Sequence, residues 1–155
     1  MLDESGSRPV AIYPGLSAQM ALLMARMPKW TASHLRPIIS DYLDSITVEP
    51  RIGNGSRIEN CGTLVNVAVG NDITISGALS LRNGMVINNA QSHRGLAYVG
   101  QGVDAENFIF EDAHVDSSAI IRNCYVGQGA IIEKGFSAHD SLFFANCHLE
   151  NGEAC

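Results

Sequence analysis

Three side chains in this sequence could do chemistry: His114, His139 and Arg94. His114 lies in the acidic stretch Phe110-Glu-Asp-Ala-His-Val-Asp116, where a neighbouring carboxylate could orient the imidazole ring. A histidine paired with such a group has the composition of a general base and its orienting partner. The alternative interpretation is a surface histidine in an acidic turn.

His139 and Arg94 are further candidates. His139 follows Ala138, a position expected to point inward, so its ring should point outward, near a corner and beside Asp140. Arg94 falls within residues 88–97, a polar stretch expected to leave the regular structure as a loop. Loops on a rigid scaffold often line binding sites, so Arg94 could bind a substrate phosphate. A solvated loop is the alternative.

A helical pattern covers residues 16–45, where apolar residues recur in two runs at a spacing of three or four. Pro28 is expected to separate two short helices, because proline is tolerated in the first turn of a helix and disrupts its interior. Pro37 would kink the second helix or start its main part. We therefore predict a helical hairpin within an N-terminal segment of residues 1–47, whose apolar face packs on the neighbouring core or forms a partner groove.

From residue 48 onward, aliphatic residues recur every five or six positions. Turn-forming residues separate these units, as in Ile52-Gly-Asn-Gly55 and Val126-Gly-Gln-Gly129. Three units would form one coil of a prism with about eighteen residues. Residues 48–155 thus predict a mainly β, single-stranded parallel solenoid of about five to six coils. The aliphatic positions expected inside are Ile52, Ile58, Leu64, Val69, Ile75, Leu81, Ile87, Val115, Ile121, Val126, Ile132, Ala138 and Phe144.

Composition limits the class of protein. The chain has 155 residues, of which 46% are hydrophobic and 17% charged, and this favours one domain. Its formal net charge of −6 argues against a nucleic-acid partner. No apolar run approaches the roughly 18 residues needed to span a bilayer, and the N-terminus lacks the features of a signal peptide. We therefore expect a cytoplasmic protein without a membrane partner.

The four cysteines form no CxxC pair, and the isolated histidines lack metal-ligand spacing, so we expect reduced thiols and no bound metal.

The solenoid units resemble the hexapeptide repeat of the left-handed parallel β-helix, the fold of UDP-N-acetylglucosamine acyltransferases. Ile52-Gly-Asn-Gly-Ser-Arg57 and Val126-Gly-Gln-Gly-Ala-Ile131 carry this resemblance. It covers about two thirds of the chain and implies a left-handed helix.

Larger blocks are similar to the middle of a longer bacterial family that is defined by a domain of unknown function. They are Leu16-Ser-Ala18, Arg51-Ile-Gly53, Leu81-Arg-Asn-Gly84, His114-Val-Asp116, Val126-Gly-Gln128, Ser141-Leu-Phe-Phe-Ala-Asn-Cys147 and Glu150-Asn-Gly-Glu-Ala-Cys155. In that family a helical hairpin interrupts the β-helix. The resemblance implies that this chain is an internal fragment, truncated at both ends, and it supplies no established catalytic residues.

The hexapeptide resemblance implies an acyltransferase- or nucleotidyltransferase-like enzyme that acts on a sugar or sugar nucleotide and binds an acyl-CoA or a nucleotide along an edge of the prism. The cofactor of an acyltransferase would be acetyl-CoA or another acyl-CoA. His114 or His139, on the outer face of a coil, would be its general base. The resemblance also implies a homotrimer. The alternative function is a non-catalytic β-helix scaffold, or a binding and regulatory module.

Overall fold

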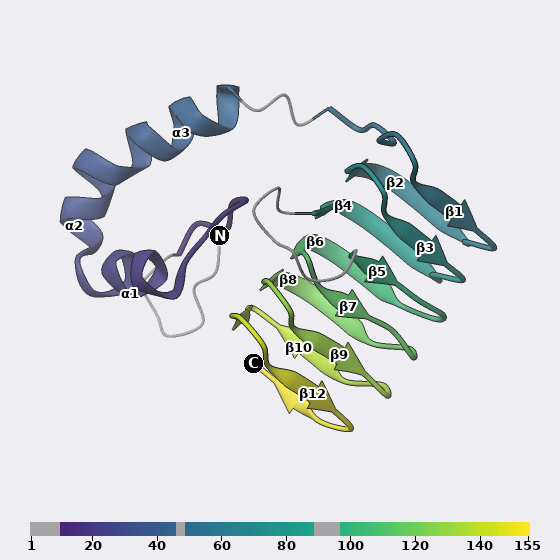
Figure 1. Cartoon of the computed structure of the whole chain (residues 1–155). Coiled ribbons are helices and arrows are strands. Elements are labelled where there is room, and N and C mark those ends of the chain that lie inside the picture. The colour runs from purple at the N-terminus through teal and green to yellow at the C-terminus, as the bar shows by residue number, and fades with distance from the viewer. Residues whose placement is uncertain (1–9, 46–48, 89–96) are drawn as a thin grey trace.

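A computed structural model of the chain describes residues 10–45, 49–88 and 97–155 and is mainly β (Figure 1). A helical segment is followed by a parallel β-solenoid of about five turns, so the predicted mainly β solenoid with a helical segment near its N-terminus is confirmed. Figure 1 shows the helices arching along one side of the stacked coils.

The helical segment contains α1 (Ala18–Arg26), α2 (Pro28–Trp30), the π-helix η1 (Thr31–Leu35) and α3 (Arg36–Ser45). Ser17 caps α1, since its hydroxyl accepts a hydrogen bond from the backbone N–H of Met20 at 3.3 Å. Pro28 occupies the first position of α2, as predicted. Pro37 has no N–H to donate to an earlier turn, which accounts for the π-helical turn directly before α3.

Each coil of the solenoid contributes strands to two parallel sheets. The first sheet contains, in spatial order, β1 (Arg57–Glu59), β3 (Thr74–Ser76), β5 (Tyr98–Val99), β7 (His114–Val115), β9 (Ile131–Glu133) and β12 (His148–Glu150). The second contains β2 (Thr63–Val69), β4 (Ser80–Ile87), β6 (Asp104–Glu111), β8 (Ile120–Val126), β10 (Ser137–His139) and β13 (Glu153–Ala154), with β11 (Leu142–Phe143) also paired to β8.

Four asparagines bend the long strands β2, β4, β6 and β8 at equivalent positions. Asn66, Asn83, Asn107 and Asn123 have φ angles of 55°, 51°, 52° and 52°. Asparagine adopts positive φ at lower cost than β-branched residues, so these positions form a corner where a valine would not. The bend divides each long strand between two faces of the coil.

The ladder of inward residues matches the predicted set on two faces and departs from it on the third. Val86 and Phe143 pair with the interior positions of their neighbouring coils, where Ile87 and Phe144 were expected. Equivalent residues in most neighbouring coils are 16 or 17 apart rather than eighteen, and they are 24 apart between β4 and β6, so a strict six-residue step loses the register. The predicted positions that are at most 1% exposed are Val69, Ile75, Leu81, Val115, Ile121, Val126, Ile132 and Ala138.

A second apolar cluster lies between the helical segment and the outer surface of the solenoid. Met85, Ile109 and Tyr125 point outward from β4, β6 and β8 and pack with Met24 and Ile39 of the helices. The apolar helical stripe therefore packs on the neighbouring core. This covers the outer face of one part of the second sheet, whereas no described helix packs on the first sheet.

A buried carboxylate fastens the N-terminal segment to the solenoid. Glu111 is only 5% exposed, and its Oε2 accepts hydrogen bonds from the Gly15 backbone N–H at 2.8 Å and the Tyr125 hydroxyl at 2.9 Å. A buried carboxylate is stable only when such donors replace water. The contact joins residues 96 positions apart, which no local pattern in the sequence could indicate.

Tyr125→Phe is expected to lower the free energy of unfolding by about 1–2 kcal/mol at pH 7, because Glu111 loses a donor. Burial, reinforced by the Glu111 charge, raises the pKa of Tyr125 above its ordinary value of 10.0. The neutral phenol thus stabilises the native protein fully below pH 10, and this contribution declines as the pH rises further. The Tyr125→Phe variant has no phenol at this position and therefore lacks that decline. The difference in the free energy of unfolding between the two proteins should narrow by about 1 kcal/mol at pH 11.

Urea unfolding at both pH values measures this difference. Tyr42→Phe, on the exposed face of α3, is the matched control and should change stability little. A loss in Tyr125→Phe that is the same at pH 7 and pH 11 would contradict the proposed role of the hydroxyl.

Candidate functional site

His114 lies on the exposed surface of the first sheet. Residues alternate along a strand, so Val115 points into the core and is fully buried while His114 and Asp116 point outward. The His114 ring stacks on Tyr98 of the adjacent strand β5, with ring centroids 4.8 Å apart and planes inclined by 25°. Its Nε2 lies 4.0 Å from Asp116 Oδ2. The imidazole and the carboxylate therefore lie near each other, at a separation longer than a hydrogen bond.

Asp116 is itself held in place. Its Oδ1 accepts a hydrogen bond from the Ser117 backbone N–H at 2.6 Å, so its second oxygen is directed toward His114. Ser117 and Ser118 both have positive φ angles, 53° and 64°, which form the corner after β7. This corner thus positions a carboxylate beside the imidazole.

A polar hollow of about 700 Å³ adjoins this pair. Tyr98 and Asp116, the two neighbours of His114, both belong to its wall. The full lining is Asn60, Ser76, Gly77, Tyr98, Gln101, Gly102, Asp116, Ser117 and Ser118. Hydroxyl, carboxamide and carboxylate groups beside one aromatic ring can hydrogen-bond a ligand rich in hydroxyl groups.

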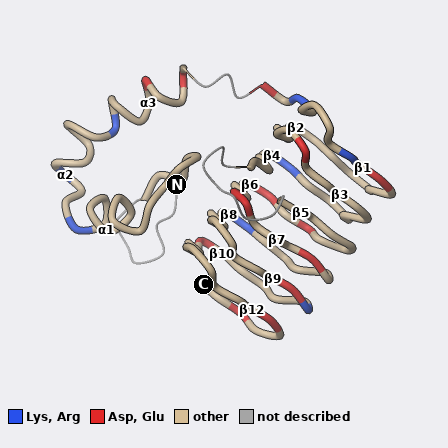
Figure 2. The backbone as a smooth tube through the Cα atoms, in the orientation of Figure 1, with Lys and Arg blue, Asp and Glu red and all other residues tan. Residues whose placement is uncertain are grey.

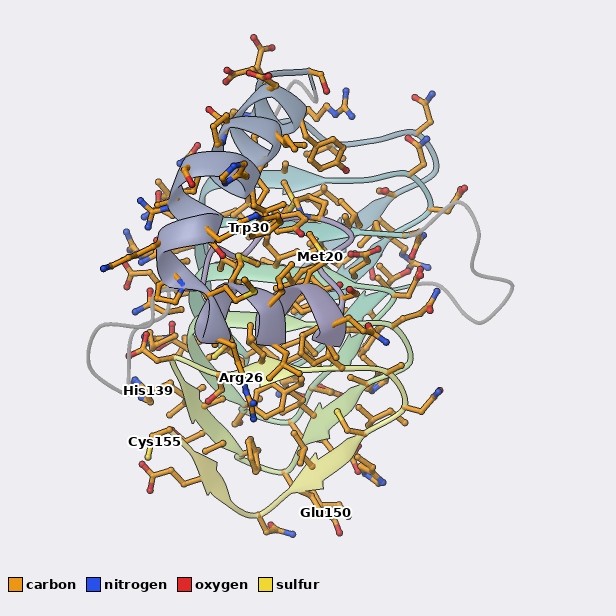
Figure 3. All side chains as sticks on the ribbon, turned by 90° about the vertical axis from the view of Figure 1, so that its left-hand side faces the viewer. Met20, Arg26, Trp30, His139, Glu150 and Cys155 are labelled. Carbon is orange, nitrogen blue, oxygen red and sulfur yellow. The ribbon has the colours of Figure 1, made fainter. Side chains whose placement is uncertain are left out.

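His139 lies on the other sheet. It ends β10 with an exposed side chain and is in register with Arg122 of β8, whose guanidinium donates to Asp104 Oδ2 at 2.5 Å. Figure 3 shows His139 at the left-hand side of the solenoid and Glu150 near its lower end. Because His139 belongs to the second sheet and His114 to the first, the structure does not bring these two histidines together. Arg94 and most of its predicted loop lie outside the described residues.

A second group of titratable side chains lies at the last strands of the first sheet, and the sequence did not predict it. Potential ligand atoms of Glu133, His148 and Glu150 lie within 4.8 Å of one another. Lys134 donates a short hydrogen bond to Glu150 and lies 3.7 Å from Glu133. This contact raises the pKa of the lysine and lowers that of Glu150. Glu133 and Glu150 are one coil apart, and this spacing could have predicted the group only if the coil length had been known.

The outer edge of the first sheet is rich in carboxylates (Figure 2). Figure 2 shows Asp and Glu positions near β7, β9 and β12, on the side away from the helical segment. Lys134 pairs with two of these groups, and Arg57 of β1 pairs with Glu59 in the same sheet. The hydroxyl-bearing part of a ligand thus fits this surface better than a phosphate group would.

The four cysteines are free thiols, as expected. Cys124 points into the solenoid core and is fully buried. Burial raises its pKa to about 11, so little nucleophilic thiolate exists near neutral pH. The role of Cys124 is to fill the core.

The fold and this surface define the chain as a parallel β-solenoid with a helical segment packed on one face and an open polar site on another. The chain belongs to the family described as Domain of unknown function (DUF4954), which matches residues 1–155. The resemblance to such a family is thereby confirmed. No curated protein matches the chain. Among the described residues, no helix has both the length and the apolar character needed to span a membrane.

Proposed function

We propose that this domain is a hexapeptide-repeat transferase that moves an acyl group from an acyl-CoA to a sugar or nucleotide sugar bound in the hollow beside His114. The observation that carries the proposal is the placement of His114 by Tyr98 and Asp116, both of which line the hollow. A proton acceptor in contact with two residues that line a polar hollow supports general-base catalysis on a ligand bound there.

The proposed reaction uses His114 as the base. Its Nε2 faces Asp116, so Nδ1 is the atom that accepts the proton of the sugar hydroxyl. The hydroxyl oxygen attacks the thioester carbonyl, the C–S bond breaks, and the CoA sulfur leaves and takes up the proton from the imidazolium. Asp116 stabilises the positive charge that the ring carries between these two proton transfers.

His114→Ala is expected to lower turnover by about 10²–10⁴-fold, because the step loses its proton acceptor. The assay incubates the protein with a panel of acyl-CoA donors and nucleotide sugars and measures acylated sugar by chromatography. His139→Ala, a histidine on the other sheet, is the matched control and should retain full turnover. Unchanged turnover in His114→Ala would overturn the role of this residue.

A second candidate is a non-catalytic binding module. The observation that favours it is the open geometry of the pair, since His114 is 44% exposed and its 4.0 Å separation from Asp116 exceeds a hydrogen bond. Nucleotide-sugar binding by the unchanged protein, with no turnover on any donor, would support this candidate over the transferase.

A further inference from the structure

The turn between α1 and α2 exposes large apolar side chains beside basic ones. Leu22, Met27 and Trp30 are 58%, 46% and 40% exposed. Arg26 and Lys29 lie between them in the sequence and are exposed as well. Apolar residues that are scattered singly over a surface are normal, but these three fall within one short segment together with the two cations. The five residues form what we call the helical corner.

The backbone holds the helical corner away from the core. Met27 ends α1 with φ −125° and ψ 58°, and Pro28 begins α2 rather than extending α1, because proline has no N–H to donate to the preceding turn. The buried residues on either side of this turn are Met24 of α1 and Thr31 of η1. Figure 1 shows the turn between α1 and α2 on the side of the helical segment away from the solenoid. The side chains of the corner are therefore accessible to a partner.

Trp30 is held by its own helix. Its ring stacks on that of His34, with centroids 5.4 Å apart and planes inclined by 12°. His34 Nδ1 lies 3.1 Å from the Trp30 carbonyl oxygen and 2.7 Å from the Ser33 hydroxyl, which fixes the imidazole ring. The indole thus stays on the outside of the helical segment. Indole rings favour the headgroup level of a membrane, since they are apolar but carry one hydrogen-bond donor.

The charge around the helical corner is positive, although the chain as a whole is negative. Residues 10–40 contain three basic residues and no Asp or Glu. Within the part of the chain that the structure describes, neither Arg26 nor Lys29 forms an ion pair. Figure 2 shows the carboxylates of the first sheet on the side away from the helical segment. Because the Debye length is about 10 Å at an ionic strength of about 0.1 M, these distant carboxylates do not cancel the local positive charge.

We propose that the helical corner docks on a membrane surface that contains anionic lipids. Arg26 and Lys29 pair with lipid phosphates, while Leu22, Met27 and Trp30 insert among the headgroups. Basic residues combined with Trp and Leu are typical of helices that lie in the membrane interface, and this favours a lipid surface over an acidic protein. The expectation of no membrane partner rested on spanning segments, whereas this contact needs none. The corner is separate from the hollow of the first sheet, so either proposal can fail without the other.

Trp30 is the only tryptophan of the chain, so tryptophan fluorescence reports directly on the helical corner. The test titrates the whole chain with phosphatidylcholine vesicles that do or do not contain phosphatidylglycerol. We expect a saturable blue shift of the Trp30 emission with the anionic vesicles. The affinity for the neutral vesicles should be at least tenfold lower, because each basic residue near an anionic surface contributes about fivefold. Raising the salt concentration from about 0.1 M to about 1 M should remove most of this difference.

The double variant Arg26→Gln with Lys29→Gln should bind the anionic vesicles at least tenfold more weakly. Arg57→Gln with Arg82→Gln makes the same change in net charge at exposed positions of the solenoid strands β1 and β4, and should bind them normally. Equal affinity for both kinds of vesicle, equal loss in both double variants, or no blue shift would each overturn the proposal. So would a blue shift that depends on protein concentration without vesicles, since it would assign the corner to a second copy of the chain. The comparison of the two vesicles uses the unchanged protein, so it decides even if a variant does not fold.

Discussion

Replacing Ile75 with aspartate is expected to prevent the solenoid from folding. Ile75 points into the core and is fully buried. Its strand β3 pairs with a strand on each side, so Ile75 lies between Ile58 and Val99 of the neighbouring coils. A carboxylate at this position would lose its hydration without gaining a partner, which costs several kcal/mol. That is a large part of the 5–15 kcal/mol by which domains of this kind are usually stable.

Circular dichroism and urea unfolding measure this effect. Thr74→Asp is the matched control, because it adds the same charge to the neighbouring residue of β3, which points outward. The control should fold and lose less than about 1 kcal/mol. A folded Ile75→Asp variant with an unchanged unfolding midpoint would show that the assigned inward register is wrong.

Gly84→Ala is expected to be the second most disruptive change, although it adds one methyl group. The new Cβ would lie 2.5 Å from two carbons of the Phe108 ring and 2.7 Å from the Phe108 carbonyl oxygen. Because one of these obstacles is backbone, a rotation of the ring alone cannot relieve the contact. We expect the free energy of unfolding to fall by about 1–3 kcal/mol, the range for overpacked cores.

Gly70→Ala is the control for this prediction. Gly70 also lies within a coil, but its nearest neighbour would be 3.4 Å from the added Cβ, an ordinary contact. Urea unfolding of the two variants should therefore separate them, with the larger loss at Gly84. Equal stability of both variants would mean that Phe108 does not lie against Gly84.

The helical segment and the solenoid were predictable because each is encoded by a local period. The two runs of apolar residues predicted helices within residues 16–45, and the structure has helices from Ala18 to Ser45. The five- or six-residue repeat predicted stacked parallel strands, which the two sheets confirm. The exact register was less predictable. Val86 rather than Ile87 points inward, because a coil of 17 residues contains one step that is shorter than six.

The candidate sites were only partly predictable. The proximity of His114 and Asp116 could be anticipated, since residues two apart on a strand point to the same side. The stacking of His114 on Tyr98 and the group around Glu133 depend on neighbouring coils, so they required the register. The Glu111 contact with Gly15 required the helical segment to dock on the solenoid.

By itself the sequence determined that this protein is a solenoid with a helical segment, because side-chain periodicity and turn-forming residues act over a few positions of the chain. Only the tertiary structure decided which coils meet and which histidine lies beside a hollow. These contacts join residues one coil or more apart. Their geometry follows from how large side chains such as Phe108 pack in the shared core, which no local pattern specifies.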